Sequence, residues 1–257
     1  MDMTNASQAM LLDCMLDLGQ LLLDCGAEIS RVEDTLDRIG KAYGAKETNV
    51  FVITSIISLT IEFSGHKAIT ETRRIIRDGG TDFIRMEKLN SLSRSVCADP
   101  IPVEQLHERV KSISKGKKPF RVQLWGSVLA AGSYAIFFGG TLLDGVAAAV
   151  FGAMICLLQL RLDKTEINTV ARNLLISLLV GIGVGIASQC MSVLHMDKIL
   201  IGDIMLLIPG LAMINAVRNI LLGNTISGLV RLADSLLWAG SLAGGFMIAL
   251  KIIDLFF

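Results

Sequence analysis

One stretch of the chain, residues 199–231, places polar side chains in a sequence apolar enough to span a bilayer. Pro209 has no backbone N–H and its ring clashes with the carbonyl four residues earlier, so a helix must break there, and Gly210 leaves no side chain to refill the gap. Broken helices inside membranes line cavities and form the substrate sites of many transporters. We therefore predict a substrate path at this break, with polar walls from Asp203, Asn215, Arg218, Asn219 and Arg231. The alternative is a kink packed against neighbouring helices, with its charges at the membrane surfaces.

The residue types around the break suggest different roles. Arg218 suits a carboxylate-bearing substrate, and Asn215 with the freed carbonyls suits an amino or hydroxyl group. Asp203 is the candidate coupling acid, because an ionisable residue in a span is costly unless it is paired or hydrated. The alternative places Asp203 at the outer interface. Several small carboxylate-bearing molecules would fit these groups equally well.

Charged residues are concentrated in residues 1–120, whereas residues 121–257 are mostly apolar. This pattern predicts a membrane protein with a small cytosolic α/β domain, in which helices cover an antiparallel sheet, followed by an α-helical bundle of five transmembrane helices. The predicted boundaries are 1–120 for the cytosolic domain and 121–257 for the membrane domain. The five predicted spans are residues 123–138, 142–160, 174–193, 199–222 and 232–257.

Lys and Arg residues in the connecting segments predict the orientation. Basic residues gather before the first span, between the second and third, and between the fourth and fifth, so the N-terminus is expected inside and the C-terminus outside. The first ten residues lack a basic segment followed by an apolar one, so no signal peptide is expected.

Within residues 1–120 the hydrophobic periodicity changes from helical to alternating and back. We expect a helix at 10–25, ended by Gly26 and carrying a solvated stripe of Asp13, Asp17, Gln20 and Asp24. A second helix to residue 43 is expected to begin with a capping box of Ser30 and Glu33. His66 and His107 are predicted to be isolated surface residues. Strands are expected at 50–53, 57–64 and 67–76, and helices at 82–97 and 103–114.

The sequence lacks the motifs of several classes of metal-binding protein and enzyme. The five cysteines are scattered, which argues against a disulfide framework or a zinc site. There is no Ser/His/Asp arrangement, H-E-x-x-H, phosphate-binding loop or nucleotide motif, so we expect no enzyme, no catalytic residue, no metal, no cofactor and no nucleic-acid partner. Transport would then be driven by an ion gradient or by the substrate gradient. Small residues four apart predict close helix packing in the membrane domain, at 127/131, 149/153, 181/185 and 240/244.

Three stretches of sequence carry a family resemblance, which extends from about residue 10 to 250. They are Gly26-Ala27-Glu28-x-x-Arg31-Val32-Glu33, the segment Thr70–Arg74, and Leu207-Ile208-Pro209-Gly210 with Ile214-Asn215-Ala216-Val217, Gly223 and Ser227-Gly228-Leu229-Val230-Arg231. The chain resembles the N-terminal half of the threonine/serine exporter family of bacterial membrane proteins, including half-transporters similar to the larger subunit of a two-component succinate exporter. One departure is Asn219, where family members often have an acidic residue. This weakens a proton-relay role at that position.

The resemblance implies a multi-pass protein of the bacterial inner membrane, a subunit of a secondary exporter of threonine and serine or of a dicarboxylate such as succinate. It implies a partner, a separate shorter membrane subunit similar to the family's C-terminal half. A homo-oligomer is the other arrangement, but it would bring two Arg218 side chains together unless an anion lies between them. Gly26, Glu28, Arg31 and Glu33 are expected to form a structural cytosolic motif. The alternative function is a membrane-anchored sensor or scaffold whose cytosolic domain carries the activity.

Overall fold

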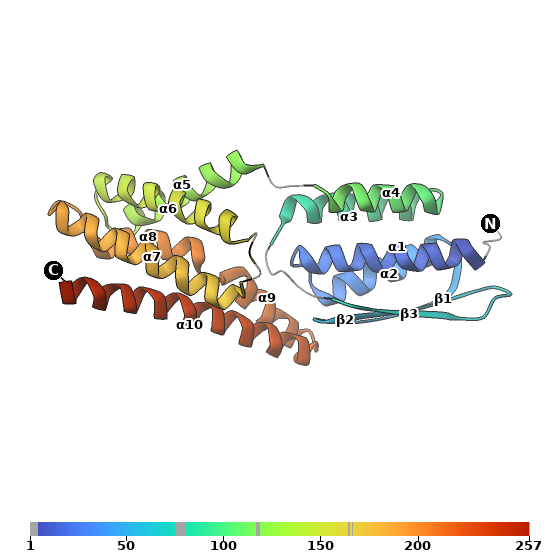
Figure 1. Ribbon diagram of the computed structural model, residues 1–257. Coiled ribbons are helices and arrows are strands. Elements are labelled where there is room, and N and C mark those ends of the chain that lie inside the picture. Colours follow the sequence, from blue (N-terminus) through green and yellow to red (C-terminus); the bar gives the residue numbers. More distant parts are fainter. Residues whose placement is uncertain (1–4, 76–80, 117–118, 164, 166, 257) are drawn as a thin grey trace. The chain divides into compact units, whose positions relative to one another are not determined.

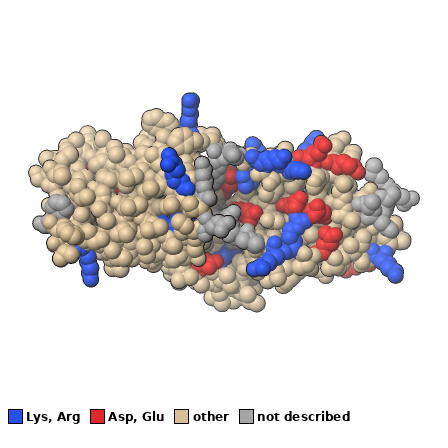
Figure 2. Space-filling view, viewed as in Figure 1, with Lys and Arg blue, Asp and Glu red and all other residues tan. Residues whose placement is uncertain are grey.

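The computed structural model describes residues 5–75, 81–116, 119–163, 165 and 167–256, and the chain divides into two compact units. Residue 76 of the third predicted strand, and Lys117, Lys118 and Lys164 of the basic segments, lie outside the described residues. The first unit comprises Met1–Lys117 and Leu211–Leu232, and the second comprises Lys118–Gly210 and Ala233–Phe257. Figure 2 shows that Lys, Arg, Asp and Glu gather over the first unit, whereas the visible face of the second is mostly uncharged and carries only a few Lys or Arg side chains.

The first unit contains a three-stranded antiparallel sheet in the order β1-β2-β3, which confirms the predicted sheet type. Helix α1 packs between this sheet and the α3–α4 pair, while α2 packs on β1 (Figure 1). The elements are α1 Asn5–Asp24, α2 Ile29–Ala42, β1 Ala45–Ile53, β2 Ile56–Phe63, β3 Ile69–Arg74, α3 Phe83–Ala98 and α4 Val103–Ser114.

The core of the first unit is built around α1, which is more buried than its sequence suggested. Fully buried aliphatic side chains of α1 meet those of α2 and β2, among them Leu11, Leu12, Leu16, Leu36 and Leu59. The acidic stripe on α1 was expected to face solvent, and this needs correction. Arg73 of β3 pairs with both Asp13 and Asp17, because α1 lies against the sheet as well as the helices.

The predicted capping box at the start of α2 is wrong. The residue before the helix is Glu28, in an extended conformation, so Ser30 already lies inside the first turn and its side chain does not cap the helix. The Glu33 carboxylate instead accepts a hydrogen bond from the Val52 backbone N–H at 3.1 Å, which joins α2 to β1. Burial raises the pKa of Glu33, and this hydrogen bond acts in the opposite direction.

The second unit is a helical bundle, and three helices, α6, α7 and α10, are long and apolar enough to cross a membrane. A fourth crossing is formed if α8 and α9, bent by 49° at their break, count as one broken span. The five predicted spans are therefore not confirmed. Helix α5 covers all but the last residue of the predicted first span, but Arg121 and Gln123 lower its hydropathy. The helices are α5 Phe120–Phe137, α6 Leu142–Leu162, α7 Thr169–Cys190, α8 Met196–Leu207, α9 Gly210–Leu221 and α10 Thr225–Phe256. The part of α9 after Gly210 and the part of α10 up to Leu232 belong to the first unit.

Small residues allow the helices of the second unit to approach closely, as predicted for three of the four motifs. A Cβ added at Gly181 would lie 2.6 Å from the Cβ of Ala249 on α10, and one at Gly152 would lie 2.9 Å from the carbonyl oxygen of Ser127 on α5. For the 149/153 pair, a Cβ added at Gly132 of α5 would lie 3.4 Å from the Cβ of Ala149 on α6. Gly240 and Gly244 differ, because no heavy atom of the described residues lies within 4 Å of an added Cβ at either one.

Candidate functional site

The turn between α1 and α2 begins at a glycine, as predicted. Gly26 has a positive φ of 88°, which lets α1 end in a Schellman motif. In this motif the Gly26 N–H donates to the Leu23 carbonyl at 2.9 Å and the Ala27 N–H donates to the Leu22 carbonyl at 3.0 Å. The turn therefore satisfies the end of α1 with its own backbone and presents Glu28 directly before the N-terminus of α2.

This turn forms one wall of a cavity of about 220 Å³ within the first unit. The opposite side comes from α9, although α9 lies far from the turn in sequence. The lining includes an apolar wall of Leu22, Val32, Phe83 and Met86 and the polar side chains of Glu28, Arg31, Thr35, Asn90, Asn215 and Arg218. The structure thus brings residues predicted for the substrate path together with residues predicted for a separate structural motif.

An ion pair joins the two sides of the cavity. Arg218 Nη1 lies 2.6 Å from Glu28 Oε1, and the side chain of Glu28 is only 12% exposed, whereas that of Arg218 is 58% exposed. The carboxylate also lies at the N-terminus of α2, where the helix dipole stabilises a negative charge. Glu28 is therefore held in place from two directions, and Arg218 is the more exposed partner of the pair.

The other polar side chains that line the cavity can form hydrogen bonds with a bound molecule, because no charged partner in the described protein occupies them. Arg31 forms no ion pair with any residue that the structure describes. Asn90, Asn215 and Thr35 add two carboxamides and a hydroxyl. Two guanidinium groups, one carboxylate and neutral donors and acceptors around a small volume can bind a small molecule that carries both charges.

Arg231 and Asn219 lie outside this lining. Arg231 is 6% exposed, and its Nη1 and Nη2 point to the Ala27 carbonyl at 3.5 and 3.4 Å, so it links the start of α10 to the same turn. Asn219 is fully buried, and neither atom of its amide forms a hydrogen bond within the described part of the chain. Of these two residues, Arg231 is therefore the one that contacts the turn.

Asp203 lies in the other unit, on α8, and is fully buried. Neither carboxylate oxygen has a hydrogen-bond partner among the residues described. The adjacent Gly202 shows how tightly α8 packs, since a Cβ added there would lie 2.6 Å from the carbonyl oxygen of Ala131 on α5. Asp203 therefore packs inside the helical bundle.

The predicted helix break is confirmed at Pro209. Helix α8 ends at Leu207, Ile208 is extended with φ −62° and ψ 127°, and α9 starts at Gly210. A residue before proline is pushed out of the helical region, which explains the conformation of Ile208. Gly210 faces open space, with no heavy atom of the described chain within 4 Å of an added Cβ. The chain passes from the second unit to the first at this point.

Two features of the second unit carry polar groups that the sequence did not single out as a site. A cavity of about 310 Å³ is lined by residues of α5, α6 and α8, including Gln123, Ser127 and Gln159. Asp144, which is fully buried, accepts hydrogen bonds from the backbone N–H groups of His195 and Thr141, so it fixes the loop before α8 to the start of α6. His195 lies about fifty residues after Asp144 in the sequence, so residue spacing did not predict this contact.

A profile of the family described as "Putative threonine/serine exporter" matches residues 13–253. The chain belongs to this family. Among curated proteins it is similar to the "Probable threonine/serine exporter" of Mycobacterium tuberculosis (strain ATCC 25618 / H37Rv), at 23% identity over 249 residues, which cover 93% of this chain. The chain spans about half the length of that relative, 46%. No solved structure matches the chain.

Membership of the threonine/serine exporter family confirms the resemblance seen in the sequence. The family motif that starts at Gly26 and the family motif around Asn215 and Arg218 line one cavity. The sequence did not predict that the two motifs lie side by side, because neither contains a feature that indicates contact with the other. The opposite charges of Glu28 and Arg218 were the one available hint.

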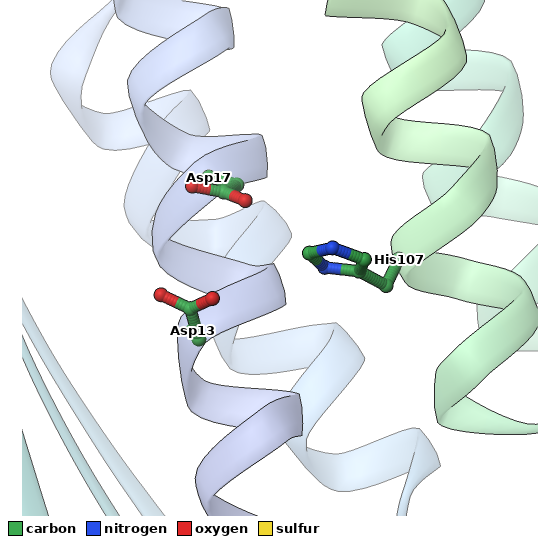
Figure 3. Close-up of side chains that lie close together, drawn as sticks. All are labelled: Asp13, Asp17 and His107. Carbon is green, nitrogen blue, oxygen red and sulfur yellow. The ribbon is translucent and has the colours of Figure 1, made fainter.

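The part of the chain that the structure describes also contains one convergence of side chains typical of metal ligands. Asp13 and Asp17 of α1 face His107 of α4 (Figure 3). The prediction that His107 is isolated is therefore wrong, because the packing of α4 on α1 brings it to the acidic stripe. His66 is exposed beside the β2–β3 turn, as predicted.

Proposed function

We propose that this chain forms the cytosolic entry site of a secondary exporter of small hydroxylated amino acids, threonine and serine. The observation that carries the proposal is the cavity in which Glu28 and Arg31 of the α1–α2 turn meet Asn215 and Arg218 of α9. Family membership supports export as the activity, and the chemistry of the cavity supports this substrate class.

An amino acid matches the cavity group by group. Its carboxylate would bind the Arg31 guanidinium, and its ammonium would bind Glu28 in place of Arg218, which can swing aside because it is more than half exposed. The hydroxyl would bind a carboxamide of Asn90 or Asn215. A dicarboxylate such as succinate would pair its carboxylates with Arg31 and Arg218, which draws Arg218 away from Glu28 and leaves that mostly buried carboxylate beside a like charge. The cavity therefore favours threonine and serine over a dicarboxylate.

Passage through the membrane would use the second unit and the break at Pro209. We propose that Asp203 couples transport to an ion gradient, because an ionised carboxylate buried without a partner is costly and so favours binding of a proton or another cation. Since the chain covers 46% of its relative, we further propose that a second membrane half, similar to the rest of that relative, completes the path in the inner membrane. The N-terminus is then cytoplasmic.

Efflux from bacterial cells with and without this chain and its second half tests the proposal. Cells loaded with labelled threonine, serine or succinate should release the two amino acids faster when both halves are present. Glu28→Gln removes the charge that binds the ammonium and should lower threonine efflux by about tenfold or more, as expected for a lost charged hydrogen bond. Glu47→Gln, an exposed glutamate on β1, is the matched control and should behave as wild type.

The opposite pattern would refute the substrate assignment. If Glu28→Gln leaves threonine efflux unchanged while succinate is exported by wild type, the cavity serves a dicarboxylate. If no small carboxylate or amino acid is released faster in the presence of the chain, it is not an exporter subunit.

A further inference from the structure

Two carboxylates and one imidazole converge on the side of the first unit where α1 packs on α4. Asp13 and Asp17 lie one turn apart on α1, so both side chains project from the same face of the helix. His107 projects toward them from α4 (Figure 3). One ligand atom from each of the three residues lies within 4.8 Å of the other two, and all three side chains are partly exposed.

Arg73 of β3 approaches the same carboxylates and has to be accounted for. Its Nη1 pairs with Asp17 Oδ1 and its Nη2 pairs with Asp13 Oδ1. Each carboxylate therefore keeps its Oδ2 atom, which accepts no hydrogen bond from the residues that the structure describes. Ligating carboxylates are commonly held by hydrogen bonds to their second oxygen, so the pairing with Arg73 leaves one oxygen of each aspartate for an ion.

The charges at this position leave room for a cation. Two aspartates and one arginine sum to a single negative charge when His107 is neutral, which is the form that binds metals. One imidazole nitrogen with two carboxylate oxygens suits a borderline divalent ion, and zinc takes three such protein ligands with a fourth, open position. Calcium and magnesium prefer sites made of oxygen alone, so the imidazole disfavours them.

We propose that Asp13, Asp17 and His107 form a binding site for a divalent transition-metal ion, zinc being the best chemical match. The ion would connect α1 to α4 at a partly exposed position of the first unit. The site is separate from the cavity that contains Glu28, since the two share no lining residue. Its failure would therefore leave the proposed exporter function untouched.

Zinc binding by the full chain, purified in detergent with any affinity tag removed, tests the site. We expect saturable binding of one zinc ion per chain in a competition titration against a chromogenic chelator. His107→Ala, Asp13→Asn and Asp17→Asn should each weaken binding by about tenfold or more, because even residues outside the ligand shell change metal affinity 10–100-fold. His66→Ala and Asp34→Asn, both exposed positions of the same unit, are the matched controls and should bind as wild type.

X-ray absorption at the zinc edge of the wild-type chain keeps the test decisive if a variant fails to fold. The proposal expects a shell of one imidazole nitrogen and further oxygens, with no sulfur. A sulfur shell would mean that cysteines bind the ion and would overturn the site. The absence of saturable zinc binding by wild type, or equal binding by folded His107→Ala and wild type, would overturn it as well.

Discussion

The two units of this chain achieve dense packing in opposite ways. In the first unit large aliphatic side chains fill the space between helices and sheet, with Leu11, Leu16 and Leu36 fully buried. In the second unit glycines bring helix backbones together, as at Gly132, where an added Cβ would lie 2.9 Å from the Gly145 carbonyl oxygen. Apolar burial drives folding in water, whereas helices in lipid gain mainly from close van der Waals contact. The packing of the first unit is therefore typical of a domain that folds in water, and that of the second unit is typical of helices in lipid.

Polar residues follow the same division. Glu28 in the first unit has Arg218 as a partner at 2.6 Å, whereas Asp203 in the second unit is fully buried without a hydrogen-bond partner among the described residues. A paired carboxylate can exchange its partner for a charged substrate. A buried carboxylate without a partner can bind a cation instead. The two acidic residues therefore suit two different steps, substrate recognition and coupling.

The largest expected effect concerns packing in the second unit. Gly245→Ala would place a methyl group 2.6 Å from the Leu174 carbonyl oxygen, so α7 and α10 must separate. We expect a loss of about 1–3 kcal/mol or more, as for other overpacked sites, measured as a lower thermal unfolding midpoint in detergent. Gly244→Ala, one residue earlier and facing open space, is the control and should be nearly neutral. Equal destabilisation by both changes would contradict packing by close backbone approach.

An intermediate effect is expected at Asp203. Asp203→Asn removes the ionisable group but keeps the shape, so it should preserve or raise thermal stability while efflux no longer responds to an imposed proton gradient. Efflux measured with and without the gradient checks this outcome. Asp254→Asn, an exposed position near the end of α10, should leave the response intact. An Asp203→Asn variant that still follows the gradient would remove this residue from the coupling step.

The smallest effect should appear in the pH dependence of the first unit. The pKa of Glu33 in the folded chain is raised above the ordinary value of 4.5, so folding is favoured while this group is protonated and loses that contribution as pH rises through the raised pKa. Glu33→Gln keeps an acceptor for the Val52 N–H but cannot ionise. Its unfolding midpoint should match wild type in acid and fall less steeply on the way to neutral pH. If the unfolding midpoints of the two proteins changed with pH in the same way, burial would not raise the pKa of Glu33.

Local rules predicted much of this structure. Alternating residues gave the antiparallel strands, Gly26 ended α1 and Pro209 broke the fourth apolar segment, because each of these effects depends on neighbours in the chain. The capping box failed for a local reason as well, since the helix started one residue before Ser30 and Glu33 turned to Val52. The contact of Glu28 with Arg218 was beyond such rules. It depends on residues 211–232 belonging to the first unit, which is a property of the tertiary fold.

Direct binding of threonine to the purified chain tests the central claim, that the cavity between the α1–α2 turn and α9 is the substrate site. Titration calorimetry should detect binding to wild type, and Arg31→Gln and Glu28→Gln should each weaken it by about tenfold or more, since charged hydrogen bonds contribute about 1.5–3 kcal/mol. Arg38→Gln, an exposed arginine on α2 that pairs with Asp34, should bind as wild type. No detectable binding by wild type, or unchanged affinity in both cavity variants, would contradict the assignment of this cavity.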